Sequence, residues 1–195
     1  MKSDPTFWIA ARATGFTAYS MVTISVLAGL ILKSRPFGNR LKPATVTDLH
    51  RFLALLALGA VGIHGTVLVY DDVVPIDWRD LFVPGGIPYR TVWTSVGVVA
   101  AELMFVIYVS FSLRRFIGVR NWRRLHWATY LVFAGVTTHG LMAGSDSHQQ
   151  WAIYLYVSAV GLVVAATVFR AIVPPVGAPG RASARARAQT EAFEA

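Results

Sequence analysis

Residues 49–65 read LHRFLALLALGAVGIHG, an almost wholly apolar run with a histidine near each end, His50 and His64. The run lies within a longer apolar segment, from Val46 to Tyr70, that has the ~20 residues a helix needs to cross the hydrocarbon core of a membrane. An ionisable side chain inside such a span is energetically expensive and by default marks a functional site. The stretch therefore predicts a membrane-spanning helix that carries two functional histidines.

A second stretch repeats this pattern further along the chain. Residues 125–140 read LHWATYLVFAGVTTHG, so that His126 and His139 take the places of the first two histidines. Each stretch begins with Leu-His and ends with His-Gly. The repetition predicts that the four histidines belong to one functional arrangement.

The composition of the whole chain is that of a membrane protein. Of its 195 residues, 55% are hydrophobic and only 14% are charged, and long apolar stretches with few charges indicate membrane spans. We predict an all-α integral membrane bundle of about five helices in residues 1–173, followed by a disordered basic cytoplasmic tail, 174–195. The expected spans run from Phe7 to Leu32, Val46 to Tyr70, Thr91 to Leu113, Trp122 to Met142 and Trp151 to Val173.

The charges in the loops predict the orientation of the bundle. Basic residues collect in the first loop, the third loop and the tail, whereas the second loop is mostly acidic and the last holds Asp146 without any lysine or arginine. Basic loops stay on the cytoplasmic side, so we expect the N-terminus outside and the C-terminus inside a cell (plasma) membrane. This topology also explains the net charge of +8, and we expect lipid rather than nucleic acid as a partner.

In that topology the second and fourth spans run in the same direction. At ~1.5 Å per residue, His50 and His64 are ~21 Å apart along their helix, and His126 and His139 are ~20 Å apart. His50 is then expected at the depth of His126, and His64 at the depth of His139. Two imidazoles across a gap between helices are what bis-histidine haem ligation requires, which predicts two b-type haems, each with an iron ligated by one pair.

The 13-residue spacing of the second pair requires a helix that twists or bulges, or different rotamers at its two histidines. At ~100° per residue, 14 positions return to within ~40° of the same face, but 13 positions miss it by ~140°. Gly135 is a plausible place for a twist or bulge. The glycines that follow two of the histidines, Gly65 and Gly140, could let a porphyrin approach the backbone.

Contacts between helices and direct metal binding account for the four histidines less well than haem does. Each histidine could hydrogen-bond a neighbouring helix, but that does not explain the matched depths. The ~20 Å separation excludes one metal site built from all four, and two separate metal sites would need carboxylates that neither helix supplies nearby. The chain has no cysteine, which excludes disulfides, thiolate-ligated haem, iron–sulfur clusters and covalent c-type haem.

At these residues the chain resembles the ferric reductase-like transmembrane domain family. The resemblance covers roughly residues 7–173 and rests on Leu49-His50-Arg51, on the paired histidines and on the Arg12-Ala13-Thr14-Gly15 stretch. That family includes ferric reductases, the membrane core of NADPH oxidases and the haem-binding membrane subunit of a bacterial methionine sulfoxide reductase system. The resemblance implies two stacked b haems that pass electrons across the membrane.

The resemblance does not extend to a soluble reductase domain. No G-x-G-x-x-G motif follows the last span, so we expect no flavin or NAD(P) domain in this chain. The electron donor would then be a quinol or a separate cytoplasmic reductase, and the acceptor would be extracytoplasmic. Two alternatives stay open: a haem-binding subunit that serves a dedicated partner oxidoreductase, and a non-enzymatic haem sensor, carrier or assembly factor.

Three further residues are candidates for a role. Arg12, near the expected depth of the outer haem, could pair with a haem propionate or simply reach the membrane interface. Glu102, near the middle of the third span, could take part in proton movement or bond another helix. His148 is expected to be a solvated residue of the last loop.

Overall fold

The computed structural model describes residues 5–34 and 42–173, and these ranges contain only helices, turns and loops. The helices are α1 (Pro5–Ser34), α2 (Pro43–Val69), the short 3₁₀ helix η1 (Trp78–Leu81), α3 (Thr91–Ile117), α4 (Val119–His126), α5 (Thr129–Ala143) and α6 (Gln150–Ile172). The all-α bundle predicted from the sequence is confirmed. The predicted disordered tail lies outside the described residues.

Four of the described helices are long and apolar enough to cross a membrane. They include Thr6–Ile31 of α1, Ala44–Val69 of α2, Thr91–Ile117 of α3 and Gln150–Ile172 of α6. They agree with four of the five expected spans, because an apolar run of this length satisfies its backbone hydrogen bonds within itself. The remaining expected span, Trp122 to Met142, is divided between α4 and α5.

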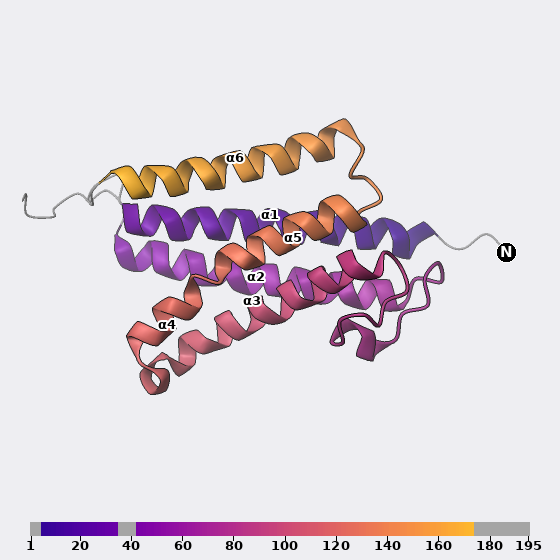
Figure 1. The fold of residues 1–195 in the computed structure, drawn as a ribbon, viewed down its shortest axis with the longest axis horizontal. Coiled ribbons are helices and arrows are strands. Elements are labelled where there is room, and N and C mark those ends of the chain that lie inside the picture. The colour runs from indigo at the N-terminus through magenta and orange to yellow at the C-terminus, as the bar shows by residue number, and fades with distance from the viewer. Residues whose placement is uncertain (1–4, 35–41, 174–195) are drawn as a thin grey trace, which may run out of the picture.

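The break between α4 and α5 falls directly after His126. Trp127 N–H donates to the Arg124 carbonyl and Ala128 N–H to the Leu125 carbonyl, so the chain tightens into i→i−3 hydrogen bonds here. The predicted distortion of this span is therefore confirmed, and the bend is visible in Figure 1. Its predicted location at Gly135 is wrong.

Gly135 has a packing role instead. It lies within the continuous helix α5, and a Cβ added there would be 3.0 Å from the Cβ of Ala100 on α3. The missing side chain lets α3 and α5 approach closely, as small residues do at helix contacts in membranes. α3 packs mainly against α5.

The best-buried cluster lies where α1 meets α5 and α6. Tyr19 of α1 packs with Phe133 of α5 and with Tyr156 of α6, at ring-centre distances of 6.2 and 4.7 Å. α1 also runs beside α2 over most of its length (Figure 1). The outward faces carry large exposed apolar side chains such as Tyr154, Leu131 and Ile172, as expected for surfaces that contact lipid.

Candidate functional site

The structure brings the four histidines of α2, α4 and α5 together as two pairs. The ring centres of His50 and His126 are 6.0 Å apart, with an angle of 82° between the ring planes. Those of His64 and His139 are 6.5 Å apart, at 78°. These are the partners that the sequence pattern predicted.

The break after His126 explains how unequal spacings give matched pairs. His50 and His64 lie on one uninterrupted helix, α2, whereas His126 ends α4 and His139 lies in α5. In a continuous helix, 13 positions would leave the second two histidines on faces ~140° apart. The tight turn at Trp127 and Ala128 changes the phase between them, so both can face α2.

Three of the four imidazoles are held at Nδ1 by a backbone carbonyl of a neighbouring helix. The acceptors are Ser25 for His50, Ala11 for His64 and Trp93 for His139, at distances of 2.8, 2.8 and 2.9 Å. A carbonyl oxygen only accepts, so Nδ1 carries the proton in each ring. The nitrogen left with a free lone pair is Nε2, and in this tautomer Nε2 can bind a metal ion.

The surroundings of His126 differ from those of the other three histidines. Its Nδ1 is buried and has no hydrogen-bond partner among the described residues, and the same is true of Nε1 of Trp122. The Trp122 ring, one turn earlier on α4, stacks on the imidazole with ring centres 5.2 Å apart. This histidine is therefore positioned by ring packing and by the end of its helix.

The spacing within each pair suits a metal ion held between two imidazoles. A metal–nitrogen bond is about 2 Å long and a ring nitrogen lies about 1.1 Å from the ring centre, so two such ligands on opposite sides have ring centres about 6 Å apart. Both observed distances are close to this value. The described residues contain no group of three or more metal-binding side chains, so a metal centre that supplies its own remaining ligands, such as haem, fits these pairs.

The glycines that follow two of the histidines do not face the pairs. A Cβ on Gly65 would meet Leu81 of η1, and a Cβ on Gly140 would run into the hydroxyl of Tyr156 on α6. Their predicted use in admitting a porphyrin is therefore wrong. The reason is that consecutive helix positions differ by ~100°, so the residue after an inward-facing histidine points to a different neighbour.

Arg12 has a partner that the sequence reasoning missed. Its Nε donates to Oδ2 of Asp146 at 2.5 Å, and the guanidinium lies 4.2 Å from the centre of the Trp8 ring. Asp146 was the lone acidic charge of the last loop, on the side of the bundle where Arg12 was expected, and that coincidence was the available signal. The propionate contact of Arg12 stays a prediction.

The structure shows where Glu102 and His148 lie but adds no new role for either residue. Glu102 is partly buried on α3, and its two possible roles stay predictions. His148 is exposed in the loop between α5 and α6, as expected of a solvated residue.

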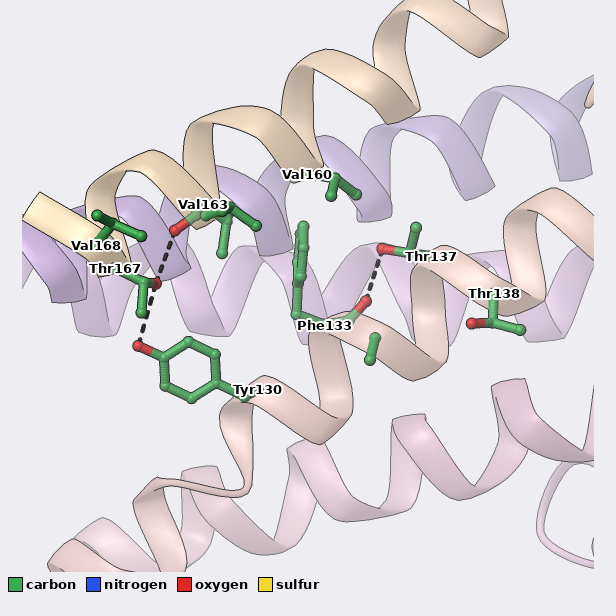
Figure 2. A pocket seen from close by; sticks show the side chains of 10 residues that line it. Tyr130, Phe133, Thr137, Thr138, Val160, Val163, Thr167 and Val168 are labelled. Carbon is green, nitrogen blue, oxygen red and sulfur yellow. Dashed lines mark hydrogen bonds between the residues drawn. The ribbon is translucent and has the colours of Figure 1, made fainter.

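A pocket of about 430 Å³ opens between α5 and α6, apart from the histidines. Figure 2 shows its wall of valines with Tyr130 and three threonines. Thr137 donates to the Phe133 carbonyl, Thr167 donates to the Val163 carbonyl, and the Tyr130 hydroxyl is 3.4 Å from that of Thr167. With these hydroxyls bonded inside the protein, the pocket offers a mainly apolar surface.

Fold and site together define a class, a multi-pass helical membrane protein with two histidine pairs enclosed by its helices. Residues 14–137 match the family described as ferric reductase like transmembrane component, and the chain belongs to that family. The match includes His50, His64 and His126 and ends two residues before His139. No curated protein and no solved structure matches the chain. Membership makes the chain a membrane electron-transfer component.

Proposed function

We propose that the chain is a b-type cytochrome that carries electrons across the plasma membrane through two bis-histidine haems. His50 and His126 would hold one haem, and His64 and His139 the other. The observation that carries this proposal is the geometry of the pairs, with ring centres 6.0 and 6.5 Å apart and Nδ1 of three rings bound to backbone carbonyls. Haem supplies the one-electron chemistry, and the protein supplies ligation, spacing and an apolar surrounding.

The separation of the pairs supports transfer across the bilayer rather than along one surface. Along α2, the two ligands are ~21 Å apart, which is most of the ~30 Å hydrocarbon thickness. Both sites lie against the apolar spans of α1 and α2, whereas α4, which carries His126, is rich in arginine. Electrons held at one pair and then at the other would cross the region that excludes free charge.

Charge on the described residues supports a direction for this transfer. Five arginines cluster at the end of the bundle where α3 meets α4, next to the His50–His126 pair: Arg114, Arg115, Arg120, Arg123 and Arg124. The loop beyond His64 is instead rich in aspartate. By the positive-inside rule, the His50–His126 pair lies near the cytoplasm. Electrons from a quinol or a separate cytoplasmic reductase would leave from the His64–His139 pair to an extracytoplasmic acceptor.

Single substitutions test the ligand assignment pair by pair. His64→Ala and His139→Ala should each remove the same one of two haems, and His50→Ala and His126→Ala should each remove the other. His148→Ala is the matched control, because this exposed loop histidine belongs to neither pair, and it should keep both haems. Haem per chain and the reduced-minus-oxidised spectrum are the measurements. Full haem content in any one of the four variants would refute its assignment.

A further inference from the structure

The three histidines with bonded Nδ1 atoms share a detail of geometry. Each lies against a glycine four residues after the carbonyl that it binds. A Cβ on that glycine would come within 2.6 to 3.3 Å of the imidazole. The three sets are His64 with the Ala11 carbonyl and Gly15, His50 with the Ser25 carbonyl and Gly29, and His139 with the Trp93 carbonyl and Gly97.

Helix geometry explains why the glycine stands four positions after the acceptor. The carbonyl of residue i points along the axis to residue i+4, whose N–H it accepts. A side chain at i+4 leans back toward the helix N-terminus and covers the turn that contains this carbonyl. Glycine at i+4 leaves the oxygen open, and its second lone pair can accept a hydrogen bond from outside the helix.

Glycines in the interior of α1 and α3 would lower helix stability with no compensating gain if they did not open these carbonyls. Glycine in a helix interior is less favourable than alanine, because more backbone freedom is lost on folding. By contrast, Gly59, Gly62 and Gly161 lie in α2 and α6 with nothing within 4 Å of an added Cβ. The chain therefore contains helix glycines with and without this contact, which provides an internal comparison.

We infer that Gly15, Gly29 and Gly97 are positioning residues that open backbone carbonyls of α1 and α3 to the Nδ1 atoms of the haem-ligating histidines. The inference rests on the proposed function and extends it from the ligands to what holds them. Each carbonyl fixes the tautomer and the ring orientation of its histidine. A hydrogen bond to Nδ1–H also makes the imidazole a stronger donor at Nε2, which favours the oxidised iron and lowers the reduction potential.

The two sites differ in how many ligands are held in this way. Both ligands of the His64–His139 site are bonded to carbonyls, but only His50 is so bonded at the other site, because His126 Nδ1 has no partner among the described residues. Gly15 lies against His64, so a substitution at Gly15 should affect only the His64–His139 haem. Gly29 lies against His50, so a substitution there should affect only the His50–His126 haem.

Gly15→Ala and Gly29→Ala are suitable test variants. An added Cβ would stand 3.2 Å from His64 Cε1 or 3.3 Å from His50 Cε1, so the ring must move by a few tenths of an ångström and its Nδ1 bond must weaken. Each variant should shift the potential of the matching haem upward and leave the other unchanged. It should also weaken retention of that haem on the order of tenfold or more. At Gly97 the added Cβ would be 2.6 Å from His139 Nδ1, so Gly97→Ala should lose the haem.

Gly59→Ala and Gly161→Ala are the matched controls and should leave haem content, spectrum and both potentials unchanged. The measurements are redox titration and the low-spin electron paramagnetic resonance signals of the purified full chain, normalised to protein. Unchanged potentials in either Gly15→Ala or Gly29→Ala, or equal shifts in the controls, would overturn the inference. If His64→Ala removes one haem but Gly15→Ala changes nothing, only this inference fails. If His64→Ala keeps two haems, the proposed function fails first.

Discussion

Asp146 illustrates how one charge can organise the end of a membrane bundle. Its carboxylate belongs to the loop between α5 and α6, it is only 9% exposed, and it accepts a hydrogen bond from Arg12 of α1. The pair links α1 to the loop that precedes α6. The carboxylate is buried whereas the Arg12 side chain is 33% exposed, so losing the carboxylate leaves a half-buried arginine without its counter-charge.

We expect Asp146→Asn to lower the stability of the detergent-purified protein by about 1–3 kcal/mol, because an amide oxygen can still accept from Arg12 but carries no opposite charge. The matched control is Arg79→Gln, which removes a second ion pair, with Asp77. Its side chains are 81% and 74% exposed, so the control should cost less than about 1 kcal/mol. Thermal unfolding of both variants measures the difference. Equal melting temperatures would show that the Arg12–Asp146 pair does not stabilise the bundle.

At the residue scale, the sequence predicted which histidines lie together but not what surrounds them. His50 and His64 could be matched with His126 and His139 because depth in a membrane follows from residue count alone. Which glycines contact the histidine rings could not be predicted, because those contacts depend on how each helix is rotated about its axis. Gly65 and Gly140 were the wrong choice for this reason, and Gly15, Gly29 and Gly97 make the contacts instead.

At the element scale, the sequence predicted that the fourth expected span is distorted, but it did not predict the position of the break between α4 and α5. The 13-residue spacing between two histidines that face the same partner helix required a change of phase somewhere between them. Local propensity favoured Gly135, but the chain breaks at Trp127 and Ala128, where α4 ends in i→i−3 hydrogen bonds. Tertiary packing decided the place, because Gly135 is needed where α5 crosses Ala100 of α3.

Gly135→Ala should therefore destabilise the α3–α5 contact, by about 1–3 kcal/mol for an overpacked interface. The added methyl would stand 3.0 Å from the Ala100 Cβ, so Ala100→Gly in the same chain should restore most of the loss. Gly161→Ala, with open space around the new Cβ, is the control and should be neutral or slightly stabilising. The melting temperatures of the three variants measure these differences in stability. A double variant no more stable than Gly135→Ala would contradict this role of Gly135 in the contact.

At the scale of the whole molecule, the bundle was predicted almost completely. Four expected spans agree with α1, α2, α3 and α6 because long apolar runs leave a helix few alternatives in lipid. The fourth expected span, which is divided between α4 and α5, is the exception. The short helix η1 and the loop around it could not be predicted, because residues 70–90 contain no long apolar run. Their form depends on contacts such as that of Leu81 with α2.

The proposed orientation can be measured directly because the chain has no cysteine. We expect a membrane-impermeant thiol reagent to label His148→Cys in intact cells, and to label Asn121→Cys only after the membrane is opened. Both positions are exposed, one in the α5–α6 loop and one in α4 beside the arginine cluster. The opposite labelling pattern would place the His50–His126 pair on the outer side and reverse the proposed direction of electron flow.

The central claim is that the two histidine pairs each hold one haem. The most direct measurement is the haem content per chain of the detergent-purified protein, read together with its dithionite-reduced minus oxidised spectrum. We expect about two b haems with the low-spin bands of bis-histidine ligation. Protein purified without haem, after expression with an adequate haem supply, would contradict the claim.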